Sequence, residues 1–204
     1  MKPVAFVGMA EGWKNAPIGN KQFELWTCNQ LSMKLNDKDI SVCFDMHDWE
    51  IADYYPTYYT HLQKKHPYKI VVPRKNAKIP KAEIFPIKQA RLMFPDHAFG
   101  STLSYVVVYA TLRGVEDLYM WGINTGEFLQ YPEYGYSFHY CLGIARTMGT
   151  RVHMVTYDVQ KPHRDYGYVK YSWKDTYDDF LAVYGNEGYV IKDGSDEKYK
   201  QDNK

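Results

Sequence analysis

Mostly apolar runs of four or five residues recur along the first third of the chain and predict strands of a sheet. Apolar runs of this length that lack alternation are typical of parallel strands whose two faces are both buried. Glycine or polar residues follow each run, which predicts that every strand ends in a loop. The runs lie at residues 4–7, 23–27, 41–44 and 69–72.

The second half of the chain changes to helical spacing. Residues 101–113 place apolar side chains at positions i, i+3, i+4 and i+7, which predicts a helix with one apolar face. Ser101 is a suitable N-cap for this helix, and Gly114 is a suitable C-terminal stop. The apolar run at 117–121 then predicts another strand.

The same order of helix, glycine and strand occurs a second time. Apolar residues at helical spacing in 138–145 are followed by Gly149 and by a strand pattern at 151–156. This alternation is typical of a parallel α/β sheet. Further helices are predicted at 174–184 and, with a break at Pro56, at 53–66.

These patterns predict one α/β domain with a Rossmann-like three-layer fold and a mostly parallel sheet. The domain is expected to span residues 1–190, and the polar tail 191–204 is expected to be disordered. Four prolines between positions 73 and 95 predict little regular structure in that stretch beyond a short helix after Pro86.

The charge of the chain is unevenly distributed, although the net charge is only +1. The segment 61–91 holds nine Lys or Arg residues and one acid, Glu83. We interpret it as a basic insertion that contacts phosphate groups, although a solvated loop without a partner has the same composition. The candidate DNA-binding residues in it are Lys64, Lys65, Arg74, Lys75 and Lys78.

The cysteines and the hydropathy pattern indicate a cytoplasmic protein. Cys28, Cys43 and Cys141 lie in apolar runs without the spacing of a metal site, so reduced thiols and no structural metal are expected. The N-terminal apolar run is too short for a signal peptide, and no run is long enough to cross a membrane.

Ligands of open α/β sheets bind beyond the carboxyl ends of the strands, and this rule selects candidate residues without any motif. Neither GxGxxG nor a Walker A sequence is present, so a dinucleotide enzyme and a P-loop kinase are not supported. Each candidate can also be a turn or capping residue. The candidates for nucleotide binding are Gly8, Met9, Ala10, Glu11, Gly12, Trp13, Asn29, Ser101, Thr102, Gly122 and Asn124.

The segment VCFDMHD, residues 42–48, ends a strand in two carboxylates and an imidazole. Asp45, His47 and Asp48 are the catalytic candidates: one of them could be a general base, or the acids could hold Mg²⁺ on a diphosphate. Asp48 could instead cap a following helix. Alternation along the strand predicts that Asp45 and His47 point to the same side. Glu127, Glu133 and His139 are candidates for contacts with a sugar or acceptor.

Several motifs occur in an order that resembles known proteins. They are GMAEGW, ELWTCNQ, FDMHD, GSTLSYVVVYATLRGVEDLYMWGIN and YGYSFHYCLGIARTMGTRVHM. Their order resembles a group of phage-encoded Rossmann-like proteins and, more distantly, the small bacterial sialyltransferases and the archaeal pterin pyrophosphokinase-like proteins.

The resemblance implies an activated nucleotide that is held by the loop 8–12 and by Asn29. The sialyltransferases need no metal and use a histidine before the last helix of the sheet, close to His139 here. Glu11 departs from the small polar residue that is usual in their first loop. FDMHD is not a sialyltransferase feature, which makes it the candidate for the chemistry specific to this chain.

The sequence therefore favours a glycosyltransferase that takes a nucleotide-sugar donor, for example a UDP-linked one, and modifies hydroxymethylcytosine in phage DNA. Tyr54, Tyr55, Tyr58 or Trp49 could support an extruded base. The alternatives are a non-enzymatic protein that sequesters a nucleotide signal of host defence and a pyrophosphokinase-type transferase that needs Mg²⁺ and ATP. The sequence does not determine the oligomeric state.

Overall fold

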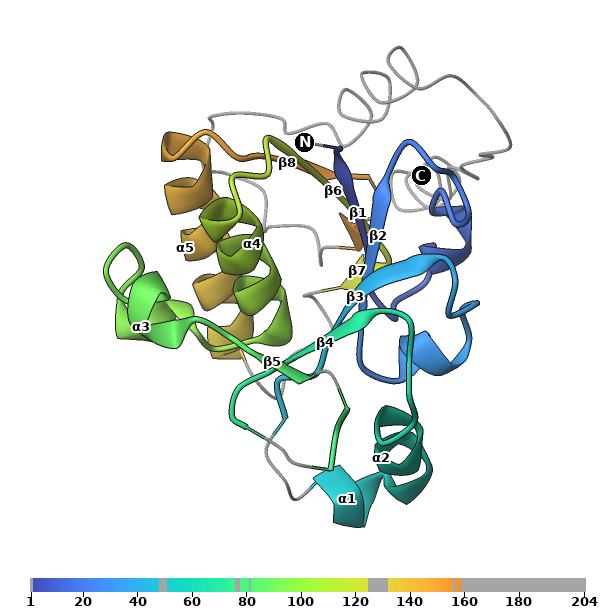
Figure 1. Cartoon of the computed structure of the whole chain (residues 1–204). Helices are drawn as coiled ribbons and strands as arrows, with labels where there is room; N and C mark the ends of the chain where they lie inside the picture. Colours follow the sequence, from blue (N-terminus) through green and yellow to red (C-terminus); the bar gives the residue numbers. More distant parts are fainter. Residues whose placement is uncertain are drawn as a thin grey trace, which may run out of the picture.

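The computed structural model describes residues 2–47, 51–75, 78–80, 82–124, 132–155 and 157–158. Within them a seven-stranded sheet has the order β5-β4-β3-β2-β1-β6-β8, with every neighbouring pair parallel (Figure 1). A second, two-stranded sheet pairs β7 (Ile123–Asn124) with β9 (Tyr157–Asp158). The seven strands are β1 (Val4–Val7), β2 (Glu24–Cys28), β3 (Ile40–Phe44), β4 (Lys69–Val72), β5 (Ala82–Ile84), β6 (Asp117–Trp121) and β8 (Arg151–Met154).

Both faces of the sheet are covered, which confirms the predicted three-layer α/β fold. Helices α4 (Thr102–Leu112) and α5 (Pro132–Thr147) cover one face. The short 3-10 helices η1 (Trp13–Asn15) and η2 (Asn29–Met33) and the helix α2 (Pro56–Leu62) cover the other. The remaining short helices are α1 (Ile51–Tyr54), α3 (Ile87–Ala90) and η3 (Asp96–Ala98).

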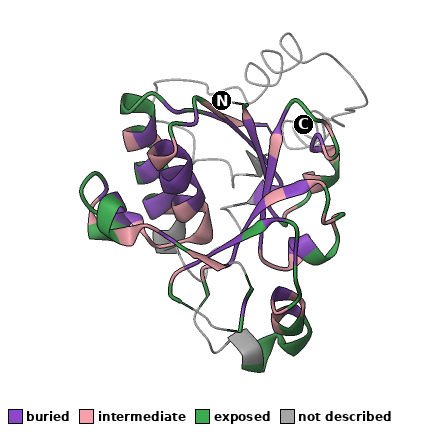
Figure 2. Cartoon of the chain, viewed as in Figure 1, coloured by how far each residue is buried: buried purple, intermediate pink, exposed green. Residues whose placement is uncertain are grey.

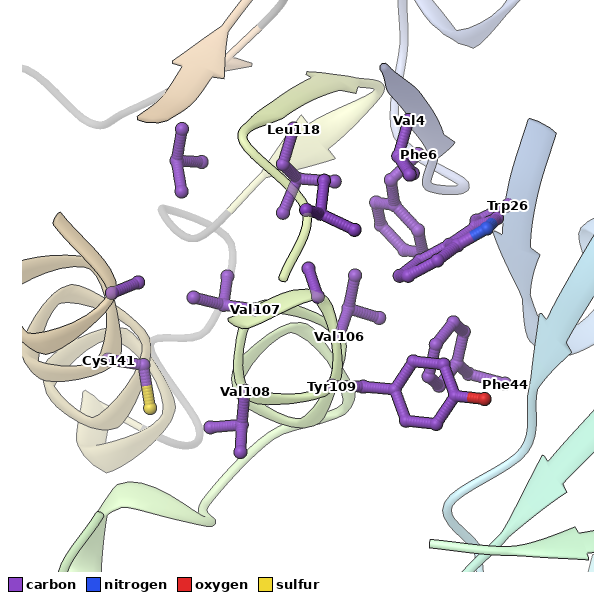
Figure 3. Close-up of a cluster of buried hydrophobic side chains, with 14 of the residues drawn as sticks. Val4, Phe6, Trp26, Phe44, Val106, Val107, Val108, Tyr109, Leu118 and Cys141 are labelled. Carbon is purple, nitrogen blue, oxygen red and sulfur yellow. The ribbon is translucent and has the colours of Figure 1, made fainter. Parts of the chain in front are cut away.

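Helix α4 forms the centre of the largest core cluster. Val106, Val107, Val108 and Tyr109 are consecutive and all buried. Successive residues of a helix point about 100° apart, so four buried neighbours mean that the helix is enclosed on all sides. Val106 and Tyr109 face aromatic rings from the strands, and α5 packs beside α4 through Cys141 (Figure 3). Burial is accordingly concentrated in the central strands and in α4 (Figure 2).

Most predicted elements are confirmed with small shifts at their ends. Ser101 is the N-cap of α4, as predicted, and its hydroxyl accepts a hydrogen bond from the amide of Ser104. The helix predicted at 53–66 is divided next to Pro56, as expected, but its second part ends at Leu62. The His66 ring bonds the carbonyl oxygen of His61 at 2.8 Å and so satisfies the end of that helix. The predicted helix 174–184 and the tail 191–204 lie outside the described residues.

Strand β5 was not predicted from the sequence, because its three residues carry no apolar run. It is held by tertiary contacts instead. Glu83 accepts a hydrogen bond from the hydroxyl of Tyr109 on α4 at 2.7 Å and pairs with Lys69 of β4 at 2.8 Å. Contacts of this kind override weak local propensity.

The last strand of the main sheet, β8, is tied to β6 by a cluster of charged side chains. Arg151 donates two hydrogen bonds to the carboxylate of Asp117, at 2.7 and 2.6 Å, and the His153 ring lies 2.8 Å from the same group. The bonds from Arg151 lower the pKa of Asp117, against the opposing effect of burial, and His153 adds to the lowering. Ionised Asp117 is therefore the form that the fold favours.

This shift predicts how the stability depends on pH. Because the pKa of Asp117 is lower in the folded state than its unfolded value of about 3.9, its contribution is complete above that value and is lost as the pH falls through the folded pKa. Asp117→Asn should remove this part of the acid dependence, an effect of about 1 kcal/mol at most for a partly exposed pair. Urea unfolding between pH 3 and 7 measures it. Asp96→Asn, which opens the exposed Arg91–Asp96 pair, is the matched control and should change little.

Candidate active site

The loops that follow β1 and β6 are in direct backbone contact. The amide of Gly8 donates to the carbonyl oxygen of Trp121 at 2.8 Å, and the amide of Ala10 donates to that of Gly122 at 2.9 Å. A Cβ atom on Gly8 would lie 2.5 Å from the oxygen of Gly122, and a Cβ on Gly122 would lie 2.7 Å from the oxygen of Gly8. Both glycines are therefore required by close packing.

This contact lies where the strand order reverses, between β1 and β6, which is the usual ligand position in such folds. The amides of Gly8, Ala10 and Trp13 are already bonded within the protein. The amides of Met9, Glu11 and Gly12 have no hydrogen-bond partner among the described residues, so a ligand at this loop could meet them. The predicted nucleotide loop thus keeps an exposed outer part, whereas Gly8 and Gly122 have a packing role.

The next strand, β2, is followed directly by Asn29, which has an unusual backbone and side chain. Its φ angle of 52° is the one positive value among the described non-glycine residues. Its Oδ1 atom is buried without a hydrogen-bond partner among the described residues. Left-handed backbone and an unpaired buried acceptor both cost free energy, and such costs concentrate at functional sites.

Strand β3 is followed directly by Asp45, which is 4% exposed. The His47 ring, on the same side as predicted, places Nδ1 2.7 Å from Asp45 Oδ1. Because an ionised carboxylate only accepts hydrogen bonds, this contact favours the tautomer with its proton on Nδ1, which in a neutral ring leaves the lone pair on Nε2. The His47 side chain is 43% exposed. A buried acid that orients a solvent-facing imidazole in this way is the arrangement of a general base.

The groups packed beneath Asp45 stay neutral. Burial raises the pKa of the Cys28 thiol to about 12, and the charge of Asp45 adds to the increase. Burial likewise raises the pKa values of Cys43 and Tyr58, again with a contribution from Asp45. Protonated thiols are poor nucleophiles, so cysteine chemistry is not favoured. His47 is therefore the ionisable group that faces both Asp45 and solvent.

Residues 29 and 45 are neighbours on the edge of the sheet. β2 and β3 are adjacent and parallel, and Cys28 is paired with Phe44. The next residues along the two strands are Asn29 and Asp45, and adjacent strands lie about 4.8 Å apart. The structure thus brings Asn29 and the Asp45–His47 pair close together on the carboxyl edge.

Ser101 and Thr102 begin α4 on the opposite face of the sheet from Asp45. The Ser101 hydroxyl lies 3.0 Å from that of Ser104, which lies 3.1 Å from that of Ser137 on α5. Ser104 and Ser137 are buried, and this hydroxyl chain joins the two helices. Packing explains the serines without a ligand.

Of the other predicted site residues, the structure describes the side chain of only some. Asp48 and Glu127 lie outside the described residues, and for Asn124 and Glu133 only the backbone is described, in β7 and α5. His139 lies on α5, and burial lowers its pKa. Its helix is on the face of the sheet away from Asp45, so it is not a partner of the Asp45–His47 pair.

The basic residues do not form one continuous flap. Lys64 and Lys65 follow α2 and precede β4, so they lie towards the amino edge of the sheet. Arg74, Lys75 and Lys78 follow β4 at the carboxyl edge, and all five side chains are exposed. Only the second group is on the edge that carries His47.

Tyr58 is the residue whose importance sequence reasoning missed. It was one of four candidates to support an extruded base, and this role is wrong for Tyr58, because the residue is 2% exposed. It packs in the cluster of Cys43, Leu62 and Ile79, and its hydroxyl has no partner among the described residues. The sequence indicates this burial through the i, i+4 spacing of Tyr58 and Leu62, which places both side chains on one face of α2.

Comparison with known proteins finds no match for this chain among protein-family models, curated proteins or solved structures. Among the described residues, no three His, Cys, Asp or Glu side chains gather as metal ligands. No helix in the described ranges is long and apolar enough to cross a membrane. The argument for function therefore rests on the geometry of the carboxyl edge.

The contact between the β1 and β6 loops can be tested with two glycine variants. Gly122 and Gly114 have similar φ angles, 62° and 68°. Nothing lies within 4 Å of a Cβ on Gly114. Gly114→Ala should therefore lower the free energy of unfolding by about 1–2 kcal/mol, because alanine is strained in the left-handed region. Gly122→Ala should lose about 1–3 kcal/mol more, because its Cβ meets backbone atoms. Equal losses in urea unfolding would contradict the packing role.

Proposed function

We propose that the chain is a glycosyltransferase that moves a sugar from a nucleotide donor to an acceptor hydroxyl, with His47 as general base. The observation that carries this proposal is the 2.7 Å hydrogen bond between buried Asp45 and the exposed ring of His47. The bond fixes the tautomer that can accept a proton at Nε2. It also engages Asp45 Oδ1, which favours an orienting role for Asp45 over a role as a ligand of Mg²⁺.

The proposed reaction is a single displacement. Nε2 of His47 takes the proton of the acceptor hydroxyl as its oxygen attacks the anomeric carbon of the sugar. The bond from that carbon to the nucleotide diphosphate breaks, and the electron pair leaves with the diphosphate. Asp45 stabilises the imidazolium that forms, in the same way that a buried acid supports histidine in a catalytic triad.

The donor is proposed to bind across the ends of β1 and β2. Asn29 supports this position, because its buried Oδ1 atom lacks a donor among the described residues and a ligand could supply one. The backbone amides of Met9, Glu11 and Gly12 border it. The exposed cations Arg74, Lys75 and Lys78, on the loop after β4, could offset the charge of the leaving diphosphate.

Transfer can be tested with DNA that contains hydroxymethylcytosine and a panel of nucleotide sugars. Mass spectrometry of the digested nucleosides should show the added sugar. His47→Gln should lower the transfer rate by about 10²–10⁴-fold, the usual contribution of a general base. Asp45→Asn should also lower the rate strongly, because the wrong tautomer becomes accessible. Donor affinity, measured by calorimetry, should be unchanged in both variants.

His97→Gln is the matched control, since His97 is an exposed imidazole on η3, away from β3. It should transfer at the wild-type rate. Full activity in His47→Gln would remove His47 as the base, and loss in His139→Gln alone would move the base to α5. No mass gain with any donor, together with tight binding of an unaltered nucleotide, would instead favour a binding protein.

A further inference from the structure

Two exposed tyrosines and three exposed cations lie around the buried side chain of Tyr58. Tyr54 ends α1 and Tyr55 directly precedes α2, and they are 75% and 50% exposed. Tyr58 follows one turn later and is buried. The two rings are thus held at the start of a helix that is anchored in the core.

The three cations lie on a loop that packs against the same buried cluster as Tyr58. Ile79, in the loop between β4 and β5, is 5% exposed and belongs to the buried cluster that contains Tyr58. Lys78 is its neighbour in the chain, and Arg74 and Lys75 begin the same loop. Packing of Ile79 therefore keeps this basic loop on the side of the molecule where α2 begins.

The third feature beside Tyr58 is the Asp45–His47 pair. Tyr58 packs in the same buried cluster as Cys43 of β3. Asp45 follows Cys43 by two residues at the carboxyl end of that strand, on the same side. Tyr54, Tyr55, Arg74, Lys75 and Lys78 thus flank, in the chain, residues of the cluster that contains Cys43, two residues before Asp45. We refer to these five residues as the tyrosine–lysine surface. Asp53, exposed on α1, is the acid nearest to it in the described sequence.

We propose that the tyrosine–lysine surface binds unpaired nucleotides of a nucleic acid strand and presents one of them to His47. Exposed aromatic rings stack on bases, and neighbouring cations follow the phosphate backbone, which is how proteins hold single strands without reading their sequence. The inference rests on the proposed function and deepens it by naming the class of acceptor. A base that is stacked on tyrosine outside a duplex exposes the substituent to be modified.

The cations beside the rings distinguish the kind of partner. A protein partner would not need three cations beside the rings, whereas a strand carries one phosphate per nucleotide. A rigid duplex shields its bases from stacking, so unpaired nucleotides fit the tyrosines better than double-stranded DNA does.

The test is fluorescence anisotropy with a labelled single-stranded DNA of mixed sequence, its duplex, and the same sequence in RNA, in the absence of any donor. The full-length chain should bind the single strand more tightly than the duplex. Tyr54→Ala and Tyr55→Ala should each weaken binding about 5-fold or more, the lower end of base–aromatic stacking. Tyr136→Ala is the control, because Tyr136 is 77% exposed on α5, and it should change affinity less than about twofold.

The salt dependence tests the cations separately. In single-strand binding, each phosphate contact contributes about 0.7 to the slope of log affinity against log salt. Replacing Arg74, Lys75 and Lys78 together by Gln should therefore lower that slope by about 2. Replacing Lys64 and Lys65 by Gln, at the other end of β4, should leave most of the slope in place.

Several outcomes would overturn the inference: no binding at low salt, tighter binding of the duplex, or equal losses in the Tyr136 and Lys64/Lys65 controls. Because no donor is present, the result is independent of transfer. Strand binding without any sugar transfer would refute the proposed function alone, and transfer to a free nucleoside without strand binding would refute this inference alone.

Discussion

The central constraint on this structure is the contact between the backbones that leave β1 and β6. These strands are neighbours at the point where the strand order reverses, and their loops approach so closely that neither Gly8 nor Gly122 has room for a side chain. In many parallel sheets the loops at this position separate and form the ligand crevice. Here hydrogen bonds join the two loops directly. The candidate functional side chains lie beside this contact, on the carboxyl edge at the ends of β2 and β3.

The features that cost free energy are gathered near the carboxyl ends of β2 and β3. Asn29 has a left-handed backbone, and two buried oxygens, Asn29 Oδ1 and Tyr58 Oη, lack a partner among the described residues. Asp45 is a buried acid with the His47 ring as hydrogen-bond partner. Each costs on the order of 1–3 kcal/mol when unpaired or strained. The enclosed helix α4 and the apolar strands beneath supply the burial that offsets them.

The fold was largely predictable because buried parallel strands and amphipathic or capped helices have strong local patterns. Strands such as Val4–Val7 and the Ser101 cap followed directly from them. Strand β5 was not predictable, since it depends on Glu83 meeting Tyr109 and Lys69, which are distant in sequence. The candidate base followed from alternation at Asp45 and His47. The role of Gly122 and the burial of Tyr58 required the tertiary structure, because a sequence shows neither close backbone approach nor which tyrosine faces inward.

The central claim is that Asp45 holds His47 in the tautomer with a protonated Nδ1 and a free Nε2. Nitrogen-15 NMR of the imidazole rings in the folded chain measures this directly, by correlating ring nitrogens with ring protons at neutral pH. The account predicts that His47 gives the pattern of one fixed tautomer protonated at Nδ1, and that this pattern is lost in Asp45→Asn. A His47 ring that exchanges rapidly between tautomers, or that is protonated at Nε2, in the unaltered chain would contradict it.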